Sequence, residues 1–215
     1  MPRQSSSPWG AIVRSLVLAT AVKVLLVPVY KSTDFEVHRN WLAVTGTLPL
    51  HRWYTEATSQ WTLDYPPLFA WFERGLALLA PLADPGMLTL TAEPYDTPAT
   101  VLFQRSTVMA GDLLLMAGVL WQTSSSSSAS SSSGGGAPHG GGGGVTPRGL
   151  AVLLVVFSPG LLLVDHVHFQ YNGMMLGLQL CALAAIGCGC PVLGAALFSA
   201  GSGSSVGGWG RDTSH

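Results

Sequence analysis

The pattern of apolar and polar positions predicts an all-α protein whose helices span a membrane. A helix needs about 20 apolar residues to cross the hydrocarbon core of a bilayer. Four segments approach or exceed that length: residues 11–30, 102–121, 149–164 and 173–200. The last two contain no charged residue. We therefore predict about four transmembrane helices.

Charged residues within the apolar segments suggest how two of these helices meet. Asp112 lies inside the second segment, and a carboxylate is costly in lipid unless it faces a partner or a wet cavity. Lys23 or Arg14 of the first segment could pair with it, and Arg105 of its own helix is a more distant partner. A helix–helix contact is the favoured interpretation. Lys23 also argues against a cleaved signal peptide at the N-terminus, since it interrupts the apolar run.

Residues 31–101 form the one long hydrophilic segment, and residues 66–83 within it predict an amphipathic helix. At 100° per residue, one side carries Leu68, Trp71, Phe72, Leu76, Leu78, Leu79 and Leu82. The other side carries Ala70, Glu73, Arg74, Ala77 and Ala80. Such a helix can lie in the membrane surface or pack on the neighbouring spans, and the sequence leaves both interpretations open.

Serine and glycine tracts divide the chain. The predicted parts are an N-terminal membrane module at 1–123, a flexible linker at 124–148, a membrane hairpin at 149–200 and a disordered tail at 201–215. Four crossings place 31–101 and 165–172 on the same side of the membrane and the linker on the other side. The two segments richest in polar and aromatic residues therefore share one compartment.

Composition supports a membrane protein and excludes several other classes. Only 10% of the 215 residues are charged, against roughly a quarter in soluble domains. The net charge of -1 provides no basic surface for nucleic acid, so we expect no nucleic-acid partner. Three cysteines are too few for a disulfide scaffold.

Polar clusters at the ends of the apolar segments are the candidates for chemistry. They lie at residues 32–41, 61–67 and 165–173. The candidate site residues are Asp34, Glu36, His38, Arg39, Asp64, Tyr65, Asp165, His166, His168 and Gln170. Because these clusters meet apolar spans, we expect a site at a membrane–water boundary.

Simpler interpretations of the same clusters stay open. The charges after the first span can be solvated loop residues, and Asp64 can mark only the start of a helix, where a negative charge is favoured. Asp165, His166 and His168 have the side chains of a zinc site, but His-x-His spacing is weak support for a metal.

Four motifs carry a family resemblance: STDFEVHRNWLA at 32–43, WTLDYPPLFAWFE at 61–73, LFQRSTVMAGDLL at 102–114 and VDHVHFQYNG at 164–173. Together they resemble the endoplasmic-reticulum glucosyltransferases that use dolichyl-phosphate glucose. The first and last motifs are closer to enzymes that add the second glucose than to those that add the first.

The resemblance implies a partial GT-C fold in the endoplasmic-reticulum membrane with its site in the lumen. It implies dolichyl-phosphate glucose as donor and a monoglucosylated oligomannose on dolichyl diphosphate as acceptor. The new bond is α-1,3, and the reaction inverts the anomeric carbon. The lipid bilayer is an implied partner, and neither a metal nor another cofactor is implied.

Inversion in a single displacement needs a base beside the acceptor hydroxyl. The loop aspartate that follows the first span in the family matches Asp34, which we predict to be the base, with Glu36 as the second choice. His38, Arg39, His166 and His168 are predicted donors to the phosphate. Asp64, Tyr65, Asp165 and Gln170 complete the predicted substrate-binding set.

The chain differs from the family in length, because the family enzymes have more than four spans. We expect an incomplete version of the fold, in which catalysis by the chain alone is in doubt. A membrane adaptor that uses the polar clusters for docking is the alternative function, and the enzyme adding the first glucose is the alternative within the family.

Overall fold

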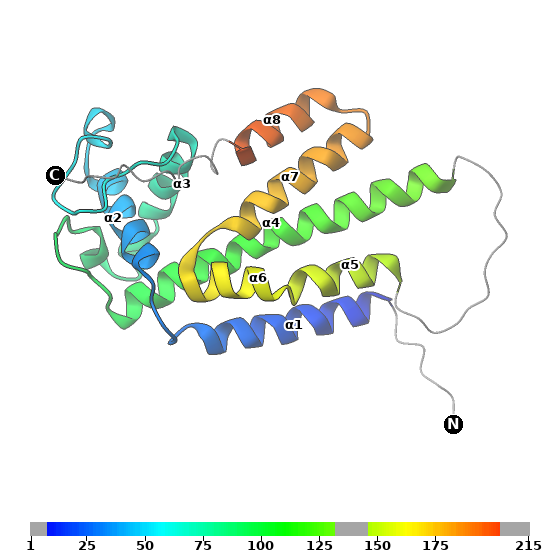
Figure 1. Cartoon of the computed structure of the whole chain (residues 1–215), viewed down its shortest axis with the longest axis horizontal. Helices are drawn as coiled ribbons and strands as arrows, with labels where there is room; N and C mark the ends of the chain where they lie inside the picture. Colours follow the sequence, from blue (N-terminus) through cyan, green and yellow to red (C-terminus); the bar gives the residue numbers. More distant parts are fainter. Residues whose placement is uncertain (1–7, 132–145, 203–215) are drawn as a thin grey trace, which may run out of the picture.

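The computed structural model describes residues 8–131 and 146–202, and these residues form helices and no strand (Figure 1). The elements are α1 (Pro8–Leu26), α2 (Thr33–Thr47), η1 (Leu50–Arg52), α3 (Pro67–Ala77), η2 (Ala80–Leu82), η3 (Pro85–Leu88), α4 (Pro98–Ser131), α5 (Pro147–Val156), α6 (Pro159–Leu161), η4 (Leu162–Phe169), α7 (Asn172–Gly187) and α8 (Pro191–Ser202). The predicted all-α class is confirmed for this part of the chain.

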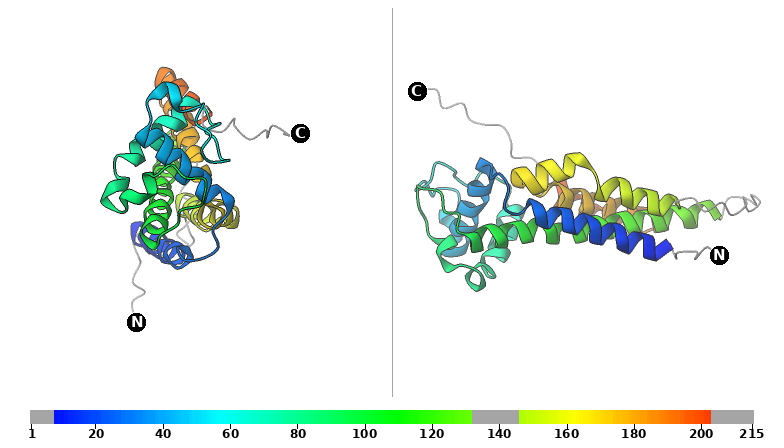
Figure 2. Two further views of the ribbon diagram at one scale, coloured as in Figure 1. Left: turned by 90° about the vertical axis from the view of Figure 1, so that its left-hand side faces the viewer. Right: turned by 90° about the horizontal axis from the view of Figure 1, so that it is seen from below.

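The long helices run side by side, and the shorter ones form a cap at one end (Figures 1 and 2). In the bundle, α4 packs along α7 and α5, while α1 lies along α5. The cap is built from α2, α3 and the short turns between residues 50 and 88, with α2 packed on α3. This arrangement brings the end of α1, the start of α4, the end of η4 and the start of α7 against the cap.

Helices cover the four segments that were predicted to span a membrane. Among the described residues, one helical stretch, Pro147–Phe169, is long and apolar enough by length and composition to cross a bilayer. Two further apolar helices, Asn172–Gly187 and Pro191–Ser202, are shorter. Four crossings therefore stay a prediction.

The predicted continuous span at 173–200 is wrong, because this segment forms the helical hairpin of α7 and α8. The turn contains Gly189 at φ +79, a left-handed conformation that glycine adopts without strain. Pro191 then starts a new helix, because its ring and missing N–H prevent continuation of the old one. At Gly194 a Cβ would lie 2.9 Å from the carbonyl oxygen of Ala182, so the absence of a side chain lets α8 pack closely on α7.

The predicted amphipathic helix corresponds to α3 and η2, and its small-residue side faces the protein. Ala70, Glu73 and Ala77 are buried, whereas Leu78 and Leu82 are exposed. Pro67 in the first turn suits a helix start, since its missing N–H would have no helical partner there. The outward leucines agree with a helix that lies in a membrane surface.

The motif directly after α1, which was treated as a polar cluster, folds into helix α2. Asp34 and Glu36 lie in its first turn, where negative charge is favoured by the helix dipole. Most of α2 is buried on more than one face, including the side chains of Glu36, His38 and Arg39. Glu36, His38 and Arg39 therefore lie inside the cap rather than in a solvated loop, whereas Asp34 is partly exposed.

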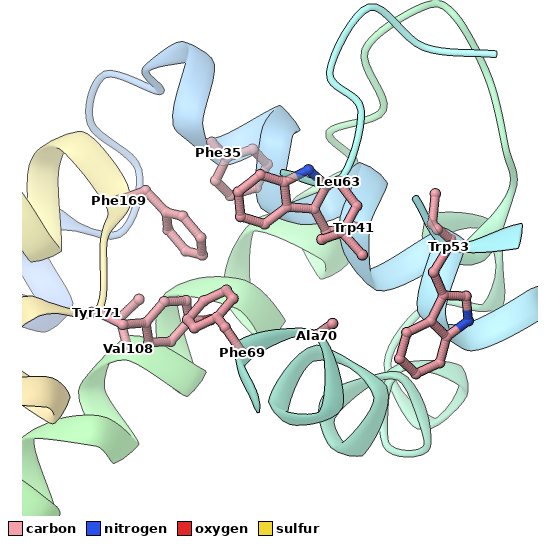
Figure 3. Close-up of a cluster of buried hydrophobic side chains, with 10 residues drawn as sticks. Phe35, Trp41, Trp53, Leu63, Phe69, Ala70, Val108, Phe169 and Tyr171 are labelled. Carbon is pink, nitrogen blue, oxygen red and sulfur yellow. The ribbon is translucent and has the colours of Figure 1, made fainter. Parts of the chain in front are cut away.

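Aromatic side chains fill the junction between the cap and the bundle. Figure 3 shows Phe35, Trp41, Phe69, Phe169 and Tyr171 converging there from α2, α3, the last residue of η4 and the residues just after it. Phe35 and Phe169 pack edge-to-face with ring centroids 5.3 Å apart, as do Phe169 and Tyr171 at 5.7 Å. Such ring pairs stabilise a specific arrangement of the segments that carry them.

The predicted linker begins later than position 124, because α4 continues to Ser131. The rest of the serine and glycine tract, residues 132–145, lies outside the described residues. So does the tail from residue 203 onward, on which the prediction of disorder falls.

Candidate functional site

A pocket opens between α2, the 60–65 segment and the residues that follow η4. It encloses about 340 Å³, which is in the range of small-molecule sites. Its lining residues are Asp34, Val37, His38, Trp41, Gln60, Trp61, Thr62, Asp64, Tyr65 and Gln170. The four residues from α2 follow helical spacing, so one face of this helix forms a wall of the pocket.

Asp34, in the motif at 32–43, contacts two residues of the motif at 164–173. His168 Nδ1 lies 3.0 Å from Asp34 Oδ2, and Gln170 Nε2 donates to the same oxygen at 2.8 Å. Asn172 Nδ2 donates to Gln170 Oε1 at 2.8 Å, which fixes the orientation of the Gln170 amide. The Asp34 side chain is 29% exposed, so this carboxylate is held by the protein yet open to the pocket.

Phe169 explains how its two neighbours reach one carboxylate. Its φ of 80 is the only positive φ of a non-glycine residue in the described segments, and its ring is fully buried. A left-handed residue changes the direction of the chain sharply, and a bulky side chain adopts this conformation only when the surroundings enforce it. Burial of the Phe169 ring therefore fixes a turn that directs both His168 and Gln170 toward α2.

Arg105 of α4 holds the backbone around this turn. Its guanidinium is buried and donates to the carbonyl oxygens of His166 at 2.5 Å, Tyr30 at 2.9 Å and Val167 at 3.1 Å. Ser32 Oγ donates to the carbonyl of His168. One buried cation thus ties the segment before α2 to the segment that carries His168. This differs from the prediction, in which Arg105 was a distant partner of Asp112.

The opposite wall carries Asp64, Tyr65 and Trp61 on a segment anchored to α2. Asn40 Nδ2 donates to the carbonyl of Trp61 at 2.8 Å, and Trp41 Nε1 donates to the carbonyl of Thr62 at 3.0 Å. Partial burial raises the pKa of Asp64. Burial also raises the pKa of Tyr65, with a smaller contribution from the negative charges of Asp34 and Asp64. Carboxylate, phenol and indole groups of this kind suit a polar ligand with hydroxyl groups.

Glu36 and Arg39 lie away from the pocket. The Arg39 guanidinium is fully buried, pairs with Glu36 and donates to the carbonyl of Thr89 at 2.6 Å. Glu36 Oε2 accepts from the backbone N–H of Tyr95 at 3.0 Å. The pair therefore holds the chain between η3 and α4 against α2, and neither residue is in the lining of this pocket.

Asp165 and His166 also point away from the pocket. Asp165 accepts from the backbone N–H groups of Asn172 at 3.1 Å and Gly173 at 2.6 Å, so it caps the start of α7. His166 Nε2 lies 3.2 Å from Asp112 Oδ2. With His168 directed at Asp34, the three members of the possible zinc cluster have three different partners.

The predicted contact of Asp112 with another helix is confirmed. Lys23 of α1 pairs with Asp112 of α4 at 2.7 Å, and both side chains are largely buried. This ion pair joins two bundle helices below the cap.

Glu73 is the site residue that the sequence did not single out. It is 1% exposed, and its Oε1 lies 2.8 Å from Nδ1 of the pocket residue His38. Burial raises the pKa of Glu73, and the bond to His38 opposes that shift. Its place beside Ala70 and Ala77, on the small-residue side of α3, was the available signal that this carboxylate faces the protein.

A family model described as the ALG6, ALG8 glycosyltransferase family matches residues 19–201. The dolichyl pyrophosphate Glc1Man9GlcNAc2 alpha-1,3-glucosyltransferase of Arabidopsis thaliana is 46% identical over 183 residues, which cover 85% of this chain and 33% of that protein. The protein of the same name from Neurospora crassa is 47% identical over 177 residues, covering 81% of this chain and 32% of that protein. One named as probable in Drosophila melanogaster is 45% identical over 169 residues, covering 79% and 30%.

The chain spans about a third of the length of these curated relatives. The matched region includes every element that lines the pocket, from α2 to the start of α7. The resemblance inferred from four short motifs is thus confirmed at the level of the family. This chain belongs to the ALG6, ALG8 glycosyltransferase family.

Proposed function

We propose that the protein transfers glucose from dolichyl-phosphate glucose to a monoglucosylated oligomannose on dolichyl diphosphate. The product would carry a second glucose in α-1,3 linkage, formed with inversion at the anomeric carbon. The observation that carries the proposal is the carboxylate of Asp34, held by His168 and Gln170 at the edge of an open pocket. The names of the matched relatives support the acceptor and the linkage.

In the proposed reaction, Asp34 is the base. The acceptor hydroxyl attacks the anomeric carbon of the donor glucose, and its proton passes to the Asp34 carboxylate. The bond between the anomeric carbon and the phosphate oxygen breaks, and its electron pair leaves with dolichyl phosphate. Attack and departure occur on opposite faces of the sugar, as in inverting glycosidases.

The surrounding residues divide into three tasks. His168 and Gln170 contact Asp34 directly, so we assign them to orienting the base rather than to binding substrate. Asp64 and Tyr65, on the opposite wall, are the proposed ligands of sugar hydroxyl groups. His38 is the proposed donor to the phosphate, because its ring lines the same pocket.

The proposed location is the endoplasmic-reticulum membrane, with several crossings and the cap in the lumen. Two features of the cap support contact with the bilayer. The pocket is lined by residues of α2 and by Gln170. Helix α2 lies at the bundle end where α1 stops and α4 starts, and Leu78, Leu79 and Leu82 are exposed on the cap's own surface. A lipid-linked donor could then present its phosphate to the pocket while its chain stays in lipid.

The test is transfer by the full product of the gene, purified and reconstituted in lipid with dolichyl-phosphate glucose. We expect transfer to the monoglucosylated acceptor, little transfer to the unglucosylated one, and loss of at least a hundredfold in kcat for Asp34→Asn. Asp96→Asn is the matched control, since Asp96 is an exposed partner of Lys31 outside the pocket. Preference for the unglucosylated acceptor would support the enzyme that adds the first glucose, and no transfer by wild type would support the adaptor.

A further inference from the structure

Glu73 is a fully buried carboxyl group next to the pocket, and among the described residues its side chain has one ionisable hydrogen-bond partner. It comes from the middle of α3, and its Oε1 is 2.8 Å from His38 Nδ1. An ionised carboxylate without a compensating charge is very costly in such a place. The side chain of His38 is that partner: with one proton between Oε1 and Nδ1 and one on Nε2, the two groups together carry no net charge.

The ring of His38 is fixed by its surroundings. Four aromatic rings, those of Trp41, Phe69, Phe169 and Tyr171, contact it edge-to-face at centroid distances of 5.1–5.5 Å. These rings come from three different parts of the chain, and Figure 3 shows where they lie at the junction. Rotation of the imidazole would break both this packing and the bond to Glu73.

The remaining ring nitrogen of His38 is available to a ligand. Nδ1 is committed to Glu73, and within the described part of the chain Nε2 has no hydrogen-bond partner and is not enclosed. Because His38 lines the pocket together with Asp34, Nε2 is the atom that can meet a substrate there. Asp34 lies four positions earlier in α2, so the two groups sit one helical turn apart on the same face.

We infer that Glu73 is a positioning residue, which holds His38 so that Nε2–H donates to the phosphate of the lipid-linked sugar donor. The inference rests on the proposed function. As the bond between the anomeric carbon and the phosphate oxygen breaks, negative charge grows on the phosphate, and the Nε2–H group of His38 stabilises it through this hydrogen bond. No bond forms to His38, and the acceptor proton still goes to Asp34.

The pH dependence of this arrangement follows from the groups around the pair. The titratable groups that face the pocket or the Glu73–His38 pair are Asp34, Asp64, Tyr65, Tyr171 and Glu73 itself. Tyr171 bonds Thr107 at 2.7 Å, and its pKa is raised well above the ordinary value, chiefly by burial, so it stays neutral over the working range. Burial raises the pKa of Glu73, so the pair keeps the proton between Oε1 and Nδ1 to higher pH. Glu73→Gln cannot hold this proton, so the alkaline limit of activity should move to lower pH.

The kinetic test compares Glu73→Gln, Glu73→Asp and the exposed control Glu93→Gln in the reconstituted enzyme. We expect Glu73→Gln to lower kcat/KM for the donor about tenfold or more and to move the alkaline limit downward, because a charge-assisted hydrogen bond is lost. Glu73→Asp should restore part of the kcat/KM value and part of the alkaline limit. Glu93→Gln should change neither quantity. In a His38→Gln background, Glu73→Gln should add little, since Glu73 acts through His38. An unshifted alkaline limit in Glu73→Gln would overturn the inference.

Binding of dolichyl phosphate separates this inference from the proposed function. It is measured without acceptor, on wild-type protein and on Glu73→Gln samples that match wild type in thermal unfolding. Weaker binding by about tenfold in Glu73→Gln, but not in Asp34→Asn, supports the inference even if no transfer is seen. Equal binding by wild type and Glu73→Gln overturns it, whether or not the enzyme transfers glucose.

Discussion

Replacement of Arg105 by methionine tests how the pocket depends on a residue outside it. Methionine also has a long unbranched side chain, but it lacks the donors to three carbonyl groups, those of His166, Val167 and Tyr30. A buried acceptor left without a partner costs about 1–3 kcal/mol. The acceptor at His166 is buried, whereas the bonds to Tyr30 and Val167 are part-buried and water can replace the lost donor there, so we expect the free energy of unfolding to fall by about 2–3 kcal/mol.

The substitution should also lower catalysis, because two of the freed carbonyls, those of His166 and Val167, directly precede His168. We expect kcat to fall while KM for the donor changes little, since Arg105 donates to the backbone oxygens of three residues that are not in the pocket lining. The assays are denaturant titration of the purified protein in mixed micelles and glucose transfer at matched folded fractions. Ser106→Ala is the control on the neighbouring exposed position of α4. A methionine variant as stable as wild type would refute the view that Arg105 ties these segments together.

Three further predictions use the same assays. Lys23→Met alone and Asp112→Leu alone should each lower the free energy of unfolding by about 3–5 kcal/mol, because each leaves a buried charge without its partner. The double variant should lose less than the sum of the two. Strict additivity would show that the pair does not interact. Arg39→Met should lower the free energy of unfolding by about 3 kcal/mol and leave KM for the donor near the wild-type value. A large increase of this KM in Arg39→Met or Glu36→Gln would show that the pair contributes to substrate binding. Because the pKa of Asp64 is raised, sugar affinity should weaken on acidification at higher pH than for an ordinary aspartate, and Asp64→Asn should remove that dependence in KM measured against pH.

Sequence alone identified the segments of the site better than the direction of their side chains. Asp34, His168 and Gln170 were all chosen because polar clusters follow apolar spans, and the structure brings them together. Glu36 and Arg39 were chosen for the same reason, yet they face the other side of α2. Periodicity can separate the two sides only once the segment is known to be a helix, and a helix buried on more than one face has no clear polar side.

Other features depended on tertiary contacts that no local pattern reports. The pairing of Lys23 with Asp112 could be predicted, because a charge in an apolar span needs a partner and few were available. The role of Glu73 could not, because its partner His38 lies 35 positions away on another helix. The hairpin of α7 and α8 was missed although Gly189 and Pro191 interrupt the segment, since hydrophobicity alone does not distinguish one long helix from two short ones.

The bond between Asp34 and Gln170 joins positions 136 apart in the sequence, which has a consequence for how the enzyme matures. During synthesis the aspartate leaves the ribosome long before the glutamine that orients it, and contacts between distant positions form late. We expect the nascent protein to pass through a stage with a folded cap and an unoriented base. If Asp34 is the base of the proposed transfer, its oriented carboxylate arises only when the later helices have joined the first.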